Sequence, residues 1–322
     1  TIGVDMDKKS LIDLAMQDMN IDPESYAGPK FKLTPQLEKL IAGHLDIDQF
    51  IKDVNAARAF LGSTKIFGSS YKLDKSNSID SADMALIASV IDTTEYLNMV
   101  CYMPPSDSSG IWNFCAWATA GCEAVCLGIG SGRMNHGYEN IARRQFNWNK
   151  DDTARAQMKR ALLFMTNRKA FIAESIVEIN AHLNTATRKG LQAAVRPNGT
   201  TDIPWETTCK VIFEIFGQSI QWYDYTKAPL NVRRNVPSNY HLTFSRAETA
   251  ENQRNAQEYI KAGFNAAVVF KAEKHKLPAE FEGMPVLDGD IHYMRFKDQG
   301  GHWVGLSAKG AAKHDKSGFV GS

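Results

Sequence analysis

The 322-residue chain lacks a long apolar segment and has almost no charge imbalance. No stretch reaches the roughly 18 apolar residues of a membrane-spanning helix. The first twenty residues mix acidic and basic side chains and contain no apolar signal-peptide core. The charges of the 37 basic and 36 acidic residues nearly cancel. This balance argues against binding to nucleic acid or to an anionic membrane through the overall charge of the chain. We therefore expect a cytoplasmic protein without a membrane partner.

Cysteine is scarce, yet three of the five cysteines lie within residues 115–126, which read CAWATAGCEAVC. An odd, clustered set fits a reducing compartment better than a disulfide framework. The spacing is Cys-x6-Cys-x3-Cys. A helix here would place Cys122 and Cys126 one turn apart on one face, with Cys115 looping back to join them.

Three interpretations of this segment stay open. The thiols are either half-buried small hydrophobic side chains, zinc ligands, or ligands of an iron–sulfur cluster. A closed structural zinc site takes four ligands, but Cys101 and Cys209 are remote in sequence and His136 stands at no signature spacing. Three thiolates without a fourth ligand suit a [4Fe–4S] cluster with one open iron. We take the cluster as the leading interpretation and zinc as the alternative.

The pattern divides the chain into a helical N-terminal region, residues 1–65, and an α/β region, residues 66–322. In the first region Thr34 marks the start of a helical stretch and Gly62 its end. Residues 81–92 predict a further short helix. The role of the N-terminal region is not indicated by any motif.

From about residue 96 short apolar segments alternate with helical ones, which is typical of βαβ units and a parallel sheet. Six or seven strands are expected, so an eight-stranded barrel is not clearly present and we predict an open or incomplete, TIM-like (β/α) barrel. Two long helices are expected at about 135–165 and 167–189. The predicted strands lie within residues 96–103, 191–199, 219–227, 240–248, 265–273, 285–296 and 302–308.

Most of these predicted strands turn polar at their carboxyl ends, where parallel α/β folds bind their ligands. The cysteine segment follows the first of them, so we expect its thiols at the same edge of the sheet. The other candidate side chains at these ends are Arg196, Asn198, Asp202, Tyr223, Asp224, Tyr225, Lys227, Ser245, Arg246, Asp288 and Asp290.

In this interpretation four residues carry out acid–base chemistry: Lys227, Asp224, Asp202 and Asp288. Lys227 is suited to act as a base or Schiff-base former if its pKa is lowered. The remaining candidates bind substrate or cofactor, the two arginines being suited to carboxylate or phosphate. Structural alternatives stay open, namely a turn at Asn198, a helix cap at Asp202, a solvated Lys227 and a tight turn at Asp288.

Several strings together resemble a bacteriophage family named after gene product eighty-eight. They are CAWATAGCEAVC, RPNGTTDIPWE, YDYTK, NYHLTFSRAE, NAAVVF, VLDGD and VGLSAKGAAKHDKSGFV, in this order. The resemblance covers about residues 96–320. It implies a phage source, and hence the cytoplasm of an infected host cell, but no reaction or catalytic residue.

A looser resemblance is to radical S-adenosylmethionine enzymes, which place a three-cysteine loop after the first strand of a partial α/β barrel. Their spacing is Cys-x3-Cys-x2-Cys, unlike that of this chain, so binding of S-adenosylmethionine is left open. The leading hypothesis is a phage-encoded iron–sulfur enzyme doing redox or radical chemistry on a small molecule or nucleotide. The alternative is a non-catalytic zinc- or cluster-stapled module that binds nucleic acid or a host protein through arginine pairs such as those in ARRQF and NVRRNV.

Overall fold

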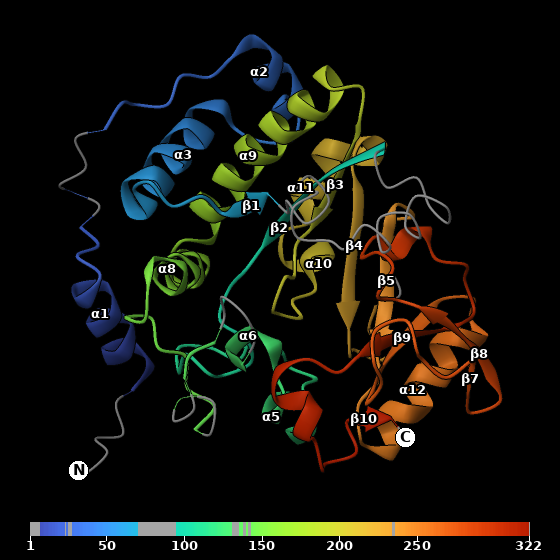
Figure 1. The fold of residues 1–322 in the computed structure, drawn as a ribbon. Coiled ribbons are helices and arrows are strands. Elements are labelled where there is room, and N and C mark those ends of the chain that lie inside the picture. The colour runs from blue at the N-terminus through green and yellow to red at the C-terminus, as the bar shows by residue number, and fades with distance from the viewer. Residues whose placement is uncertain are drawn as a thin grey trace, which may run out of the picture.

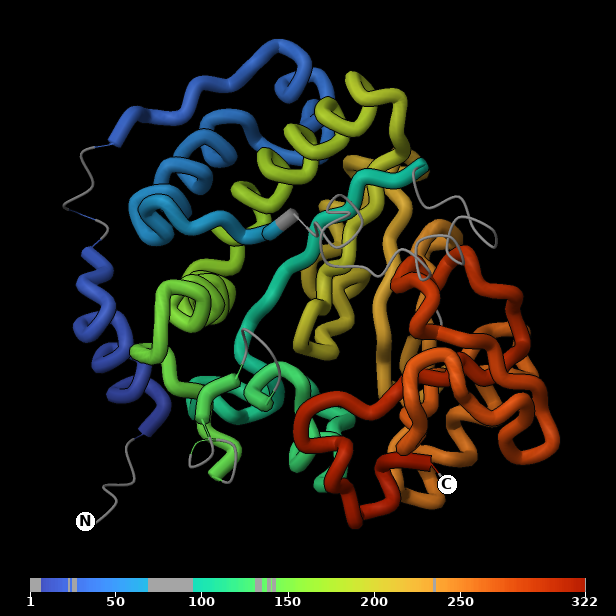
Figure 2. The backbone as a smooth tube through the Cα atoms, viewed as in Figure 1, coloured from blue at the N-terminus to red at the C-terminus, as the bar shows by residue number. Residues whose placement is uncertain are grey.

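The computed structural model describes residues 7–22, 24, 28–69, 95–130, 135–137, 140, 143–233 and 236–321. The helix predicted for residues 81–92 lies outside the described residues. Figures 1 and 2 show the helical N-terminal part beside one end of a long twisted sheet, with the later strands and the C-terminus at the opposite end of the same sheet. Within the described ranges, no helix has the length and apolar character needed to cross a membrane.

Three helices precede the sheet, and a side chain caps the start of each: α1 (Lys8–Asp18), α2 (Pro35–Ile41) and α3 (Ile47–Leu61). The predicted start at Thr34 and end at Gly62 are confirmed, since the Thr34 hydroxyl accepts the Leu37 N–H and Gly62 follows α3 with a positive φ of 62°. The stretch between them is not one helix, because residues 42–46 separate α2 from α3. The apolar sides of these helices join a core with α8 (Asp152–Thr166) and α9 (Arg168–Arg188).

The sheet has ten strands in the order β1-β2-β3-β4-β5-β6-β9-β8-β7, with β10 also pairing β6. All pairings are parallel except β1 with β2 and β7 with β8. In the described chain the pairing ends at β1 and β7, so the sheet is open. The strands are β1 (Phe67–Ser69), β2 (Tyr96–Cys101), β3 (Gln192–Arg196), β4 (Gln221–Thr226), β5 (Tyr240–Ser245), β6 (Asn265–Phe270), β7 (Glu280–Phe281), β8 (Met284–Asp288), β9 (Trp303–Ser307) and β10 (Val320–Gly321).

The seven predicted strands are all present, as β2 to β6, β8 and β9, and the α/β class is confirmed. The helix predicted for about 135–165 is shorter, because Asp151 caps α8 and the described residues 143–150 form turns and irregular chain. The remaining helices are short except the last: α5 (Ala120–Ala124), α6 (Leu127–Gly130), α10 (Trp205–Thr208), α11 (Lys210–Phe216), α12 (Ala250–Lys261), and the 3-10 turns η4 (Gly217–Ser219), η5 (Arg295–Lys297) and η6 (Gly310–His314).

The two faces of the sheet differ in chemistry. One face carries apolar side chains such as Met99, Val195 and Trp222, which belong to the core that includes α9 and α11. Since side chains alternate along a strand, the register places polar residues together on the opposite face, which we call the polar face. Its members are Asn98, Arg196, Tyr223, Tyr225, His241, Thr243, Ser245 and Asn265.

Candidate functional site

The parallel strands all end at one side of the sheet, which we call the carboxyl edge. The cysteine loop, residues 102–130, follows β2, and the segment 197–204 follows β3. Figure 1 shows α5 and α6 of the cysteine loop close to η6 and β10. The prediction that the cysteine loop lies at the ends of the parallel strands therefore agrees with the structure.

Glu248, which follows β5, connects the cysteine loop to the sheet through hydrogen bonds. Its carboxylate accepts the N–H of Gly121 at 2.8 Å and the hydroxyl of Thr119 at 2.7 Å. A Cβ atom on Gly121 would lie 2.5 Å from the carboxylate of Glu248 and from the Ser317 hydroxyl oxygen. A side chain at position 121 would therefore have to displace the Glu248 carboxylate and the Ser317 hydroxyl, and so disturb the hydrogen bonds that Glu248 accepts from Gly121 and Thr119.

The three clustered thiols lie in different local surroundings. The Cys115 sulfur accepts the Ser106 N–H at 3.2 Å, and the Cys126 sulfur accepts the Gly128 N–H at 3.4 Å. Cys122 packs instead against an apolar cluster formed with residues of the C-terminal segment. All three are half-buried and none is in a disulfide. Two of the sulfurs therefore already receive backbone amide donors.

Electrostatics links the three thiols to one another and to the end of β4. Burial raises the pKa of all three, that of Cys126 to about 12, and the negative charge of Cys122 raises the pKa of Cys126 further. The positive charge of Lys227 opposes this effect and lowers the pKa of Cys122 and Cys126. At neutral pH the three thiols are therefore protonated, and a metal that binds them has to displace their protons.

The arrangement of the cysteines differs from the predicted one. Helix α5 ends at Ala124, and Cys126 stands between α5 and α6, so Cys122 and Cys126 do not share one face of a continuous helix. Over the described ranges, no group of three or more His, Cys, Asp or Glu side chains is assembled as a metal site. His136 packs on Phe146 and accepts the Asn147 N–H. The donor types suit a thiolate-bound group, whereas a formed ligand cage is not present in these residues.

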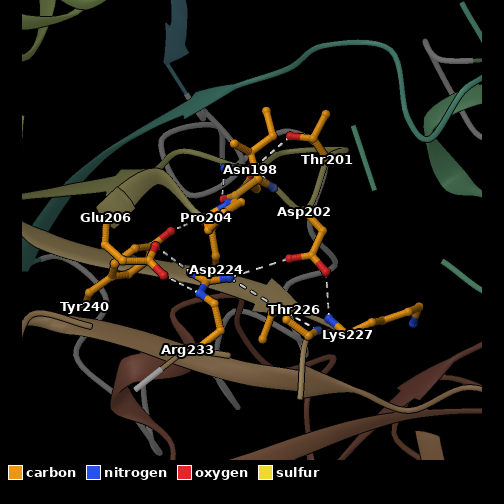
Figure 3. Close-up of polar contacts among 12 residues, drawn as sticks. Asn198, Thr201, Asp202, Pro204, Glu206, Asp224, Thr226, Lys227, Arg233 and Tyr240 are labelled. Carbon is orange, nitrogen blue, oxygen red and sulfur yellow. Dashed lines mark hydrogen bonds and ion pairs between the residues drawn. The ribbon is translucent and has the colours of Figure 1, made fainter. Parts of the chain in front are cut away.

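Asp224 is the centre of a buried network at the end of β4 (Figure 3). Its carboxylate is fully buried and accepts the Asn198 N–H, the Asn198 side-chain amide and the Tyr240 hydroxyl, at 2.9, 2.9 and 2.6 Å. Burial raises the pKa of Asp224 to about 7, although the Arg196 cation, 3.8 Å away, opposes the rise. The network fixes the strand end, and Tyr240 is a member that the sequence did not single out.

A second buried network joins the ends of β3, β4 and β5 (Figure 3). Asp202 accepts the backbone N–H of Lys227 at 2.8 Å and lies 3.7 Å from the Arg233 guanidinium, which also binds Glu206. The Lys227 ammonium donates to the Ser245 hydroxyl at 2.7 Å and to its carbonyl at 3.0 Å. Lys227 is buried, so the structural alternative of a solvated surface lysine is wrong.

Arg246 is placed away from these two networks. Its guanidinium donates to the carbonyls of Gly318 and Phe319, at 2.6 and 2.8 Å, and to the side chain of Gln253. These contacts hold the segment before β10 against the end of β5. Nε and Nη1 of Arg246 are therefore engaged in contacts within the fold, and its role in binding a ligand stays a prediction.

Asp288 and Asp290 also stand at a strand end, beyond β8. Asp288 contacts the imidazole of His275 at 2.7 Å, and both side chains are about a quarter exposed. Asp290 accepts the N–H of Ser307 at 2.8 Å and pairs with Lys309. No sequence pattern indicates His275, because it lies in the loop after β6 and meets Asp288 only through the sheet order.

The polar face carries the last two predicted residues, Tyr223 and Tyr225. As alternation predicts, they point away from Asp224: Tyr225 lies under the Arg196 cation, 5.0 Å from it, and Tyr223 contacts Phe296 of η5. Asn98 lies on the same face and is almost fully buried. Sequence reasoning missed Asn98 because it stands inside an otherwise apolar strand.

Comparison with known proteins adds one match. Neither a curated protein nor a solved structure matches the chain. A family model described as gene product 88 matches residues 73–322, which starts earlier than the resemblance expected from about residue 96 and includes all of the carboxyl edge. The match covers well over half of the chain and leaves α1 to α3 outside it. The chain therefore belongs to the gene product 88 family.

Proposed function

We propose that the chain is a phage-encoded iron–sulfur protein in which Cys115, Cys122 and Cys126 hold a [4Fe–4S] cluster at the carboxyl edge. The observation that carries the proposal is the placement of all three cysteines in one loop at the carboxyl edge, where backbone N–H groups already point at two of the sulfurs. Thiol ligands must lose their protons on metal binding. A bound cluster would neutralise part of the charge of the three half-buried thiolates, and the positive charge of Lys227, which lowers the pKa of Cys122 and Cys126, would balance a further part.

The backbone around two of the sulfurs supports the same proposal. Hydrogen bonds to the sulfurs are one of the means by which proteins set the potential of an iron–sulfur cluster. The N–H groups of Ser106 and Gly128 already point at the sulfurs of Cys115 and Cys126. We expect both hydrogen bonds to become stronger when the sulfur atoms are ionised, because charge-assisted hydrogen bonds are the stronger kind.

Such a cluster supplies an electron-transfer centre and one iron open to a small ligand. We propose that the surrounding residues bind and orient a small molecule or nucleotide for redox or radical chemistry in the cytoplasm of the infected cell. Arg196 and Lys227 are the cations at the ends of β3 and β4, and Asp224 and Asp202 are the neighbouring carboxylates. An incomplete α/β barrel, of which the open sheet is the described part, is the fold we propose for this chemistry.

A second candidate function is that of a non-catalytic binding protein for nucleic acid or a host protein. In this case bound zinc or an iron–sulfur cluster only stabilises the fold. One observation favours it: Arg246, Asp288 and Asp290 are committed to contacts inside the fold. Three of the side chains expected to serve a substrate then hold loops together instead. Under this proposal the thiols have a structural role, and their loss unfolds the cysteine loop.

Metal analysis of the anaerobically purified protein distinguishes these functions. We expect about four iron and four sulfide per chain and a brown chromophore, with loss of both in Cys115→Ala, Cys122→Ala and Cys126→Ala. Cys209→Ala is the matched control, since Cys209 is buried and remote from the loop, and it should keep the metal.

Each other result selects an alternative. One colourless zinc per chain supports the stapled module. A metal-free protein whose stability is unchanged in all three variants makes the thiols ordinary core side chains and refutes both metal proposals. Addition of S-adenosylmethionine tests the remaining resemblance: an unchanged electron paramagnetic resonance signal of the reduced cluster rejects that cofactor.

A further inference from the structure

A hollow lies where the N-terminal helices meet the part of the chain that the family model matches. Its volume is about 260 Å³, many times the space that one water molecule needs and a little below the range typical of sites for drug-sized ligands. The lining comes from the segment before α3, from α3 itself, from α9 and from α11, and Figure 1 shows α3 beside α9. The hollow therefore has room for a small organic molecule.

The floor of the hollow is apolar. Phe50 and Ala173 are buried beneath it, at 2% and 3% exposed. Three aliphatic side chains that are only partly buried complete this surface and pack against the same core: Leu45, Ile172 and Val211. Covering these side chains with an apolar group removes further apolar surface from water, which is favourable. The floor is therefore suited to an aliphatic or aromatic side chain.

One rim of the hollow is acidic, and a glutamine orders it. Asp46, Gln49 and Asp53 lie three and four residues apart and so share one side of α3 at its start. The Gln49 backbone N–H donates to Asp46 at 2.7 Å, and its side-chain amide donates to Asp53 at 3.0 Å. In the described structure the second oxygen of each carboxylate and the Gln49 side-chain carbonyl have no partner. These three acceptors match the three N–H donors of an ammonium group.

A cation lines the same hollow. Lys169, in the first turn of α9, is exposed. Among the residues that the structure describes, it forms no ion pair with Asp46 or Asp53, although all three line one hollow. Its ammonium group is therefore open to an anionic group of a ligand. A molecule with an ammonium group, a carboxylate and an apolar body complements all three parts of the lining.

We propose that this hollow binds a free apolar α-amino acid of the size of leucine or phenylalanine. The α-ammonium group donates to Asp46, Gln49 and Asp53, the α-carboxylate pairs with Lys169, and the side chain covers the apolar floor. Because α3 lies outside the family match whereas α9 and α11 lie inside it, the bound amino acid stabilises the contact between the two parts. The proposal does not depend on the cluster, since no residue of the cysteine loop lines this hollow.

A ligand series tests the proposal. Isothermal titration of the protein with L-leucine, L-isoleucine, L-methionine and L-phenylalanine is expected to show saturable binding of at least one of them. Alanine, which has both charges but little apolar surface, should bind tenfold or more weaker than leucine. The same loss is expected for 4-methylpentanoate, which is leucine without its ammonium group. Isoamylamine, which is leucine without its carboxylate, should bind several-fold weaker, because an exposed ion pair contributes less.

Variants locate the binding in this hollow. Asp53→Asn should weaken it about tenfold, Lys169→Met several-fold, and Val211→Phe, which fills the hollow, should abolish it. Asp48→Asn and Lys52→Met are the matched controls, because both change an exposed charge on α3 that does not line the hollow, and they should bind as the parent does.

Thermal unfolding checks that each variant is folded and gives a second readout. A bound amino acid should raise the melting temperature of the parent and of both controls, but not that of Val211→Phe. The proposal is overturned by absence of binding for all four apolar amino acids, by equal binding of leucine and 4-methylpentanoate, or by equal binding to the parent and to Val211→Phe. None of these outcomes depends on the metal content of the protein.

Discussion

Asp224→Asn is expected to change how the stability of the protein depends on pH. The Asp224 carboxyl is fully buried, and burial raises its pKa from 3.8 to about 7. Between these values the native state binds more protons than the unfolded chain. The free energy of unfolding of the parent therefore falls as pH rises from about 4 to about 7. Asparagine does not titrate, so in the variant residue 224 makes no contribution to the pH dependence of the free energy of unfolding.

The size of the effect follows from the two pKa values. Each pH unit in that interval changes the free energy of unfolding by about 1.4 kcal/mol, so the whole interval corresponds to an upper limit of about 4 kcal/mol. Tyr240→Phe gives a second test. It removes the hydroxyl that donates to the Asp224 carboxylate at 2.6 Å. Loss of this donor raises the pKa of Asp224 further, so the free energy of unfolding continues to fall at higher pH.

Urea unfolding at pH 5, 6, 7 and 8 measures these slopes, with the fluorescence of the buried Trp205 and Trp222 as the signal. Other groups titrate in the same window, since burial also raises the pKa of Glu178 to about 7. The difference between parent and Asp224→Asn isolates Asp224 from them. Equal slopes for the parent and this variant between pH 5 and 7 would refute the reasoning.

Two further predictions concern the carboxyl edge. Gly121→Ala places a Cβ 2.5 Å from Glu248 and should destabilise the fold by about 1–3 kcal/mol, whereas Gly68→Ala, whose nearest neighbour is 3.9 Å away, should change the melting temperature little. Arg233→Ala leaves Glu206 buried and unpaired and should cost about 3–5 kcal/mol in urea unfolding. Adding Glu206→Gln should recover part of that loss, and a purely additive double variant would contradict the pairing.

The strands and the carboxyl edge were predictable because they rest on local patterns. An apolar segment such as Ala193–Val195 followed by polar residues predicts both a buried parallel strand and the position of its end. The same reasoning placed Asp224 and Lys227 among the candidate side chains at a strand end, whereas their burial is seen only in the structure. Their partners Tyr240 and Ser245 lie on β5, and only the pairing of β4 with β5 brings them together.

The order of the last strands was not predictable, because it depends on contacts between distant segments. Sequence order suggests β8 beside β6, whereas β9 lies between them. The contact of His275 with Asp288 follows from that order and has no local signal. Asn98 was not predicted for a different reason. Its neighbours in the strand are apolar, so the sequence pattern predicts a buried strand and does not single out one polar residue within it. Only the folded sheet shows that its side-chain atoms are buried without a hydrogen-bond partner by strict geometry.

The position of β9 between β6 and β8 sets an order of assembly during synthesis. A nascent chain that has reached residue 300 already contains β6 and β8 but not β9, so the exposed side of β6 has no native partner. Two unpaired parallel strands in one growing chain can combine wrongly, and such pairing is slow to correct. During synthesis β6 therefore lacks part of its native pairing until Trp303–Ser307 and then Val320–Gly321 have emerged.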